Sequence, residues 1–292
     1  MFKGVFTALV TPFTRDGALD EPALRRIVED QIESGIAGLV PVGTTGESPT
    51  VTHAENIRVV EIVVEQANGR VPVIAGTGSN ATAEAIDMTL RAKQIGATAS
   101  LQVTPYYNKP NQEGLYRHFS SIAETADLPI IVYNIPGRSA RNIENDTMLR
   151  LAAHPNIVAV KEASGDLAQV MDLIARKPDE LAVLSGDDNL ALAICCLGGD
   201  GVVSVASNLL PSEIVKMIDA ILDGRLIEAR AMHYRLLPLF KSVFLDTNPI
   251  PIKYAMYAAS RLQEVYRLPL VPLDDEKKAI VDAVLRDLKI TV

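Results

Sequence analysis

The sequence has 292 residues, 48% of them hydrophobic, which is enough for a large core in one or two domains. Its formal net charge is −8 and it has no lysine- or arginine-rich run, which argues against nucleic-acid and anionic membrane partners. It lacks a signal-peptide pattern and any apolar run near the roughly 20 residues that span a bilayer, so we expect a cytoplasmic protein that acts on small molecules.

Eight strand-like runs follow one another up to residue 224. They lie at residues 4–10, 38–42, 71–76, 99–104, 129–134, 157–162, 181–186 and 201–205. Apolar residues at helical spacing fill intervening segments such as 20–35, 52–69 and 82–96, and recur after the last strand at 211–224. Strands alternating with helices predict a parallel sheet, and eight such units match a closed (β/α)8 TIM barrel better than an open sheet.

The pattern changes after Gly224 to helices alone. These are expected at residues 225–244, 249–263 and 274–288, between loops that contain proline. We therefore expect a catalytic barrel over residues 1–224 and a helical extension over residues 225–292. The two cysteines, Cys195 and Cys196, are adjacent in an apolar helical stretch and are expected to be buried, with no disulfide.

The loops that follow the strands carry most of the unusual polar residues. Barrel enzymes place their chemistry at the C-terminal ends of the strands, so these loops should meet at one mouth. They read GTTGES, GTGSN, TPYYN, YNIPGR, KEASGD, SGDD and SVASN. The residues that this arrangement brings together are Thr44, Thr45, Tyr107, Tyr133, Arg138 and Lys161.

Lys161 is conspicuous because it ends a strand of buried character. Burial lowers the pKa of an unpaired lysine and leaves a neutral, nucleophilic amine. The alternative is a structural lysine paired with a carboxylate such as Glu162. Likewise Tyr133 could only fill the barrel, and Arg138 could be a solvated surface charge. Together, hydroxyl groups and an arginine around a lysine favour a Schiff-base site over an ion pair.

Other chemistries have weaker support. Residues 76–81, GTGSNA, match a dinucleotide-binding fingerprint, but the next strand lacks the acidic residue that a nicotinamide-dependent oxidoreductase needs there. GTTGES lacks the spacing of a P-loop. The four histidines show no metal-ligand spacing, so we expect neither a metal nor a cofactor.

Several long segments of the sequence together resemble a known enzyme family. GLVPVGTTGESPTVTHAE, TPYYNKPNQEGLYRHF, YNIPGRSA, AVKEASGD and GGDGVVSVASN closely resemble the dihydrodipicolinate synthase family, within a superfamily of barrel enzymes that form Schiff bases with pyruvate-like 2-oxo acids. The resemblance spans essentially the whole chain. It implies condensation of pyruvate with L-aspartate 4-semialdehyde to 4-hydroxy-tetrahydrodipicolinate, in lysine biosynthesis by way of diaminopimelate.

The same resemblance implies roles for the mouth residues. Lys161 would form the imine with pyruvate, Tyr133 would be the general acid and base, and Thr44 and Tyr107 would complete a hydroxyl relay. In the family the tyrosine that matches Tyr107 comes from a neighbouring subunit, which implies a homo-oligomer, usually a tetramer built as a dimer of dimers.

Substrate-binding roles follow from the resemblance as well. The backbone N–H of Thr45 would hold the pyruvate carboxylate, with Gly186 and the carbonyl of Val203 close by. Arg138 would bind the carboxylate of the aldehyde, for which a guanidinium fork is well matched. N-acetylneuraminate lyases and 2-keto-3-deoxy-sugar-acid aldolases share the barrel, the lysine and the tyrosine, and Arg138 and Tyr107 argue against them. A catalytically silent sensing barrel is a further alternative, and the intact Lys161 and Tyr133 argue against it.

Relatives that are inhibited by L-lysine suggest a regulatory site. The residues that match it are Ser48, His53, Asn80, Glu84 and Tyr106. Glu84 would pair with the α-amino group, Asn80 and Tyr106 would take the carboxylate, and His53 would lie near the ε-ammonium. Helix capping by Ser48 and Asn80 is the alternative. Pro49 and Asn56 depart from the pattern of sensitive relatives, so we expect weak or partial inhibition.

Overall fold

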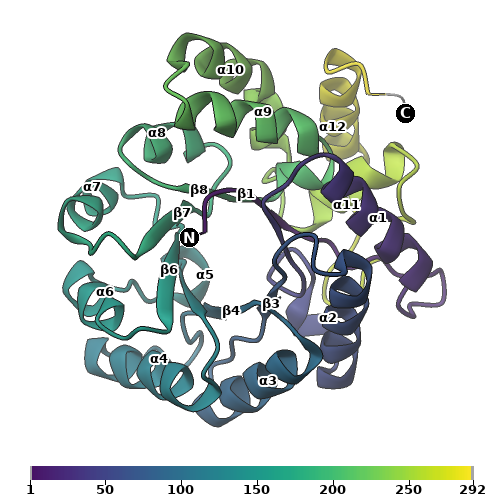
Figure 1. The fold of residues 1–292 in the computed structure, drawn as a ribbon. Helices are drawn as coiled ribbons and strands as arrows, with labels where there is room; N and C mark the ends of the chain where they lie inside the picture. Colours follow the sequence, from purple (N-terminus) through teal and green to yellow (C-terminus); the bar gives the residue numbers. More distant parts are fainter. Residues whose placement is uncertain (1, 291–292) are drawn as a thin grey trace.

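The computed structural model describes residues 2–290 as a ring of parallel strands surrounded by helices (Figure 1). The strands are β1 (Gly4–Ala8), β2 (Gly38–Val40), β3 (Ile74–Gly76), β4 (Ala99–Val103), β5 (Ile130–Asn134), β6 (Ile157–Glu162), β7 (Ala182–Ser185) and β8 (Gly201–Ser204). They pair in the order β2, β1, β8, β7, β6, β5, β4, β3. A parallel bridge between Leu39 and Val73 brings the two end strands together. The predicted (β/α)8 TIM barrel is confirmed.

Helices form the outer layer and the C-terminal part. They are α1 (Glu21–Glu33), α2 (His53–Ala67), α3 (Thr82–Ile95), α4 (Gln112–Ala126), α5 (Pro136–Ser139), α6 (Asn145–Ala152), α7 (Leu167–Arg176), α8 (Ala191–Cys196), α9 (Pro211–Leu222), α10 (Leu226–Ser242), α11 (Ile250–Ala258) and α12 (Asp275–Asp287). Short 3₁₀ turns lie at Ser48–Thr50 and Ala206–Asn208. Local signals start several helices: Asp20 caps α1, and Thr52 forms a capping box with Glu55 at the start of α2.

Alternate residues of each strand face the barrel interior and the helix layer. The interior cluster is apolar and includes Phe6, Val40, Ile74, Leu101 and Ile131. Residues of opposite parity pack under the surrounding helices in two larger clusters. The barrel is therefore filled by side chains, and substrate access is confined to its mouth.

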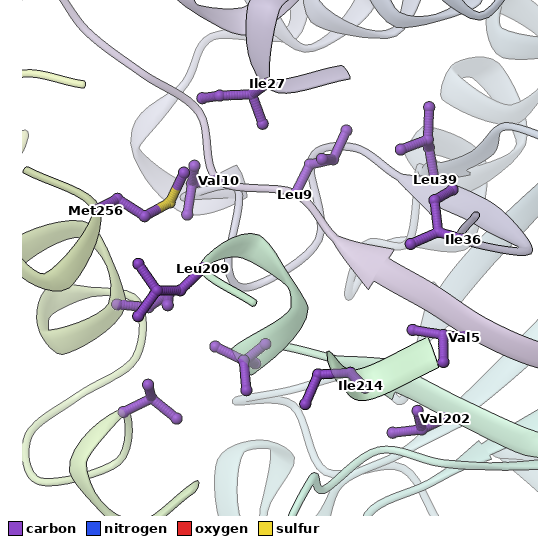
Figure 2. Close-up of a cluster of buried hydrophobic side chains, with 14 of the residues drawn as sticks. Val5, Leu9, Val10, Ile27, Ile36, Leu39, Val202, Leu209, Ile214 and Met256 are labelled. Atoms are coloured by element: carbon purple, nitrogen blue, oxygen red, sulfur yellow. The ribbon is translucent and has the colours of Figure 1, made fainter. Parts of the chain in front are cut away.

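The C-terminal helices are joined to the barrel by a shared hydrophobic cluster. Figure 2 shows Met256 of α11 beside Val10, which follows β1, and close to Leu209, which follows β8. Helices α10, α11 and α12 contribute further buried residues to the same cluster, among them Leu236 and Leu285. The three helices expected after residue 224 are thus present: α11 and α12 lie on the side of the barrel where α1 lies, and α10 lies beside α9 and α8 (Figure 1).

The cysteines differ from the expectation at one position. Cys195 is buried, and burial raises the pKa of its thiol to about 12. Cys196 is exposed, so the prediction was wrong for this residue. Successive residues of an α-helix point about 100° apart, so a short helix such as α8 turns neighbours to different faces. In the described part of the chain, none of the helices combines the length and the apolar character that a membrane crossing requires.

Candidate active site

Lys161 and Tyr133 lie side by side at the C-terminal ends of β6 and β5. Their Cα atoms are register partners in the parallel pairing of these strands. Both side chains are buried, with 5% and 4% of their surface exposed. The Lys161 Nζ atom lies 4.0 Å from the centroid of the Tyr133 ring. The pairing of β5 with β6 therefore brings two residues that are distant in the sequence into contact.

Glu162 does not pair with Lys161. Consecutive strand residues point to opposite faces, so Lys161 faces the barrel interior with Ala159, and Glu162 faces the helix layer. The Glu162 carboxylate accepts hydrogen bonds from Asn134 Nδ2 at 3.0 Å and from the backbone N–H of Ser164 at 2.6 Å. The structural alternative for Lys161, an ion pair with Glu162, is therefore wrong.

The electrostatic surroundings favour the neutral amine of Lys161. Burial lowers its pKa to about 7, the charge of Asp188 opposes this shift, and Arg138 adds to it. Asp188 is itself buried and accepts hydrogen bonds from the Ser204 hydroxyl at 2.5 Å and from the backbone N–H groups of Val205 and Ala206. Asp188 is thus held by other donors, and near neutral pH a large fraction of Lys161 is unprotonated.

A second buried lysine shows what a structural lysine looks like in this protein. Lys253 of α11 is fully buried and donates to the carboxylate of Glu47 and to the carbonyl of Val265 at 2.7 Å. Its ammonium also lies 4.5 Å from the centroid of the Phe13 ring. Lys161 has no such carboxylate partner within residues 2–290. The contrast supports a chemical role for Lys161.

Tyr133 faces a cavity of about 220 Å³ at the barrel mouth. Burial raises the pKa of Tyr133 to about 12, while the charge of Arg138 and a hydrogen bond with the Thr44 side chain pull it the other way. The phenol is therefore protonated near neutral pH and is able to donate. The cavity is lined by Val42, Gly43, Thr44, Ser48, Pro49, Gly76, Gly78, Leu101, Val103, Tyr106, Tyr133, Arg138 and Ser139.

Arg138 is exposed at the rim of this cavity. Its Nη2 atom donates to the backbone carbonyl of Asn248 at 3.3 Å, and its charge acts on both Lys161 and Tyr133. A positive charge close to both groups is suited to hold a substrate anion over them. Arg138 is exposed, as a solvated surface charge would be, but it also lines the cavity beside Tyr133.

Of the other residues expected to bind substrate, Gly186 lies against Lys161, whereas Val203 of β8 and Thr45 of the loop after β2 are buried. A Cβ atom on Gly186 would lie 3.1 Å from Lys161 Cε, so glycine permits the close approach of this backbone to the lysine. Val203 is buried in the barrel interior on β8. Thr45 is buried, and its hydroxyl accepts a hydrogen bond from Asn248 Nδ2 at 3.0 Å. None of these three residues lines the 220 Å³ cavity within the described part of the chain.

Tyr107 is not brought into the site of its own chain. Its side chain is 88% exposed, and its backbone has a φ of 71°, the left-handed conformation that non-glycine residues adopt rarely. It projects from the loop after β4 next to Tyr106, which does line the cavity. Within the described chain, Tyr107 is therefore absent from the cavity that Thr44 and Tyr133 line.

Four of the five residues expected to bind L-lysine surround a smaller cavity of about 70 Å³. Ser48, His53, Glu84 and Tyr106 line it, and His53 Nε2 lies 2.8 Å from Glu84 Oε1. Asn80 does not line it; its carbonyl accepts from Asn108 Nδ2 at 2.8 Å.

Helix capping does not account for these residues. The cap of α3 is Ala81, without a side-chain bond, and Thr52 caps α2. Ser48 and Tyr106 line both the smaller cavity and the larger one, so a ligand in the first would contact the wall of the second.

Sequence reasoning missed three participants in the site. Asp188 sits in the SGDD loop, which was expected at the mouth, but nothing in the sequence distinguishes its buried carboxylate from that of Asp187. Asn248 and Lys253 lie in the C-terminal extension, more than 200 residues from their partners Thr45 and Glu47. The lysine within the apolar sequence IPIKYAM could have indicated that Lys253 is buried and needs a carboxylate partner.

Comparisons with known proteins agree with this geometry. The profile of the dihydrodipicolinate synthetase family matches residues 1–288. A 4-hydroxy-tetrahydrodipicolinate synthase from Pelobacter propionicus is 50% identical over 286 residues, which cover 98% of each chain. Among solved structures, the chloride-inhibited dihydrodipicolinate synthase from Acinetobacter baumannii, complexed with pyruvate, has a TM-score of 0.98 at 41% identity and covers 99% of this chain and 100% of its own.

A further solved structure is similar to this chain over almost its whole length. The enzyme from Cyanidioschyzon merolae, crystallised with lysine bound, has a TM-score of 0.97 at 40% identity and covers 99% of both chains.

Proposed function

Since this chain belongs to the dihydrodipicolinate synthetase family, we propose that its barrel mouth condenses pyruvate with L-aspartate 4-semialdehyde to give 4-hydroxy-tetrahydrodipicolinate. The enzyme is a lyase of the class I aldolase type, and its reaction belongs to lysine biosynthesis. We place this biosynthetic step in the cytoplasm. The observation that carries the proposal is a buried lysine, packed against the face of a buried tyrosine, that has no carboxylate partner among residues 2–290.

The neutral amine of Lys161 attacks the ketone carbon of pyruvate, and the ketone oxygen leaves as water when the imine forms. Protonated, the imine withdraws electrons, so the methyl group loses a proton and an enamine results. The enamine carbon attacks the aldehyde carbon of the second substrate, forming the new C–C bond, while the aldehyde oxygen takes up a proton. Attack of the second substrate's own amine on the imine carbon closes the ring and releases Lys161.

Proton transfer is assigned to Tyr133. Its hydroxyl interacts with Thr44 and its ring packs against Lys161, so the phenol lies beside the position where the imine would form. We propose that Thr44 passes protons onward to Tyr107 of a neighbouring subunit. The outward side chain of Tyr107, which is 88% exposed, supports a homo-oligomer, and the family resemblance favours a tetramer.

Pyruvate would be held by the loop after β2 and by its neighbours. We assign its carboxylate to the backbone N–H of Thr45, with Gly186 and the Val203 carbonyl adjacent. Gly186 lies against the Lys161 side chain, which supports this placement. On this account the catalytic unit is the barrel, residues 1–224, and residues 225–292 form a supporting extension.

Arg138 should bind the carboxylate of the aldehyde substrate. Arg138→Ala is expected to raise the KM for L-aspartate semialdehyde, with a cost of roughly 1.5 to 3 kcal/mol for the lost charge-assisted contact. Imine formation with pyruvate should persist. Steady-state kinetics with each substrate varied in turn measures this, with Arg141→Ala as control, an exposed arginine three residues away that lines no described cavity. Equal kinetics for Arg138→Ala and the parent would refute the assignment.

Sugar-acid aldolases of the same superfamily remain the second candidate function. They share the lysine and tyrosine, but they need room for a polyhydroxylated chain, and Arg138 at the rim favours a short substrate with a free carboxylate. The deciding experiment compares turnover of pyruvate plus aspartate semialdehyde with cleavage of sialic acid and keto-deoxy sugar acids. Preferential cleavage of a sugar acid would overturn the proposed substrate.

We also propose that L-lysine binds in the smaller cavity and inhibits the enzyme partially. Glu84 supplies a carboxylate for an ammonium group, and Tyr106 and Ser48 connect this cavity to the active site. Pro49 and the buried Asn56 also line it, and both depart from the pattern of sensitive relatives. Partial or weak inhibition is therefore expected.

Titration of L-lysine into the steady-state assay tests the regulatory site. The parent should lose part of its activity at millimolar L-lysine, and Glu84→Thr should lose most of this response, because the ammonium partner is gone. Glu124→Thr, an exposed glutamate on α4, is the control. A parent that is not inhibited, or a Glu84→Thr variant inhibited as strongly as the parent, would leave these residues with a structural role alone.

A further inference from the structure

One segment of the C-terminal extension reaches into the active site. Asn248, in the connection between α10 and α11, contacts two loops of the barrel mouth. Its Nδ2 atom donates to Thr45 Oγ1 at 3.0 Å, and its backbone carbonyl accepts from Arg138 Nη2 at 3.3 Å. These are the loops assigned above to the carboxylates of pyruvate and of the aldehyde. A single residue outside the barrel therefore joins both anion-binding groups.

The contact is buried and directional. Asn248 and Thr45 are both buried, so their hydrogen bond is shielded from water. The Asn248 Oδ1 atom has no hydrogen-bond partner in the described part of the chain, which means that the side chain is oriented by Thr45 alone. Among the described residues, the side-chain amide of Asn248 is therefore committed to Thr45, and the two side chains hold each other in place.

The same segment is anchored under the loop after β2. Five residues beyond Asn248, Lys253 forms its buried ion pair with Glu47, two residues beyond Thr45. Glu47 has a φ of 55°, and a Cβ atom on Gly46 would lie 2.8 Å from the backbone of Val42, so this turn is tightly constrained. A buried charge pair is costly to break from one side, which makes the anchor permanent in the folded protein.

We propose that Asn248 is a positioning residue that sets where Thr45 and Arg138 stand relative to each other, with the Lys253–Glu47 pair as its anchor. This inference rests on the proposed function of both groups. Asn248 acts through Thr45 and Arg138 and touches no reacting atom. The extension therefore contributes to substrate affinity in addition to covering the barrel.

The first test is the kinetics of Asn248→Ala. The variant should raise the KM for pyruvate about three- to tenfold, the value of one buried hydrogen bond, and raise the KM for the aldehyde by a smaller factor. Its kcat should change little, because Lys161 and Tyr133 are untouched, and the pH profile of kcat should match that of the parent. Arg138→Ala, by contrast, should affect the aldehyde alone.

A double-mutant cycle isolates the contact. Thr45→Val removes the hydroxyl that Asn248 bonds and keeps the backbone N–H of residue 45. The double variant should raise the KM for pyruvate no further than either single variant does, because both remove the same interaction. Multiplying effects would show that the two residues act independently and would overturn the proposal.

The control is Tyr254→Phe, which removes a hydrogen bond from Tyr254 to Asp282 between α11 and α12, at 2.9 Å, and touches neither loop of the mouth. It should lower the melting temperature slightly and leave both KM values unchanged. If Tyr254→Phe raised the KM for pyruvate as much as Asn248→Ala does, destabilisation of the whole extension would explain the effect. The proposed positioning role of Asn248 would then be refuted.

A second variant is available if Asn248→Ala does not fold. Asn248→Ser replaces it, because the shorter serine side chain does not reach Thr45.

Imine trapping with saturating pyruvate separates the proposed function from the role of Asn248. Failure of the parent to trap pyruvate refutes the proposed function. A parent that traps pyruvate, together with a folded Asn248 variant of unchanged KM, refutes only the role of Asn248.

Discussion

Lys161→Ala should abolish turnover, with a fall in kcat of at least about 10⁴-fold. Lys161 is the nucleophile of the proposed reaction, and the other lysines near it are unsuited to replace it: Lys253 is held by Glu47 in the extension, and Lys109 is exposed on the loop after β4. Loss of Lys161 therefore removes the covalent route itself. Coupled steady-state assays measure the effect, and Lys241→Ala, an exposed lysine of α10, is the control that should keep full activity.

Lys161→Arg separates charge from nucleophilicity. Arginine keeps a positive charge, but it does not form an imine, because its guanidinium stays protonated in proteins. It should therefore be as inactive as Lys161→Ala. Substantial turnover by either folded variant would show that the reaction proceeds without this lysine.

Tyr133→Phe is expected to lower kcat about 10²- to 10⁴-fold, the usual contribution of a positioned general acid or base. The phenylalanine ring keeps the packing against Lys161, which lies 4.0 Å from the ring centroid in the parent, and only the hydroxyl is lost. Because the neutral amine of Lys161 remains, trapping of pyruvate should persist at a reduced rate. Pre-steady-state and steady-state kinetics together distinguish slow proton transfer from lost binding.

Tyr116→Phe is the matched control for this variant. Tyr116 also lies in a cation–π contact, with Arg150 at 4.0 Å from its ring centroid, but it is on α4 in the helix layer. Its replacement should leave kcat unchanged. A Tyr133→Phe variant with nearly the activity of the parent would remove the tyrosine hydroxyl from the mechanism and would assign the proton transfers to another group.

The fold could be predicted because its signals are local and repeated. Each short β-branched run and each amphipathic helix is readable within its own segment, and the regular alternation of the two fixes the parallel barrel. The rule that chemistry lies at strand ends then brings Tyr133 and Lys161 to one mouth without knowledge of any contact. The exposure of Cys196 could not be predicted in this way, because the elements that pack against a short helix determine which of its faces is exposed.

The alternation of side-chain direction along a strand allows one feature of the site to be predicted from the sequence. Lys161 and Glu162 are consecutive in one strand, so their side chains point to opposite faces, and this alternation by itself disfavours an ion pair between them. Contacts between distant segments are different. The hydrogen bond from Asn248 to Thr45 and the pair of Lys253 with Glu47 depend on how the extension folds back on the barrel, which no local pattern encodes.

The most direct test of the central claim is borohydride reduction in the presence of pyruvate, followed by intact-mass and peptide mass spectrometry. The reaction predicts one reduced pyruvate adduct per chain, located on the peptide that contains Lys161, and no adduct in Lys161→Ala. An adduct on Lys253 or on any other lysine, or no adduct in the active parent, would contradict the mechanism.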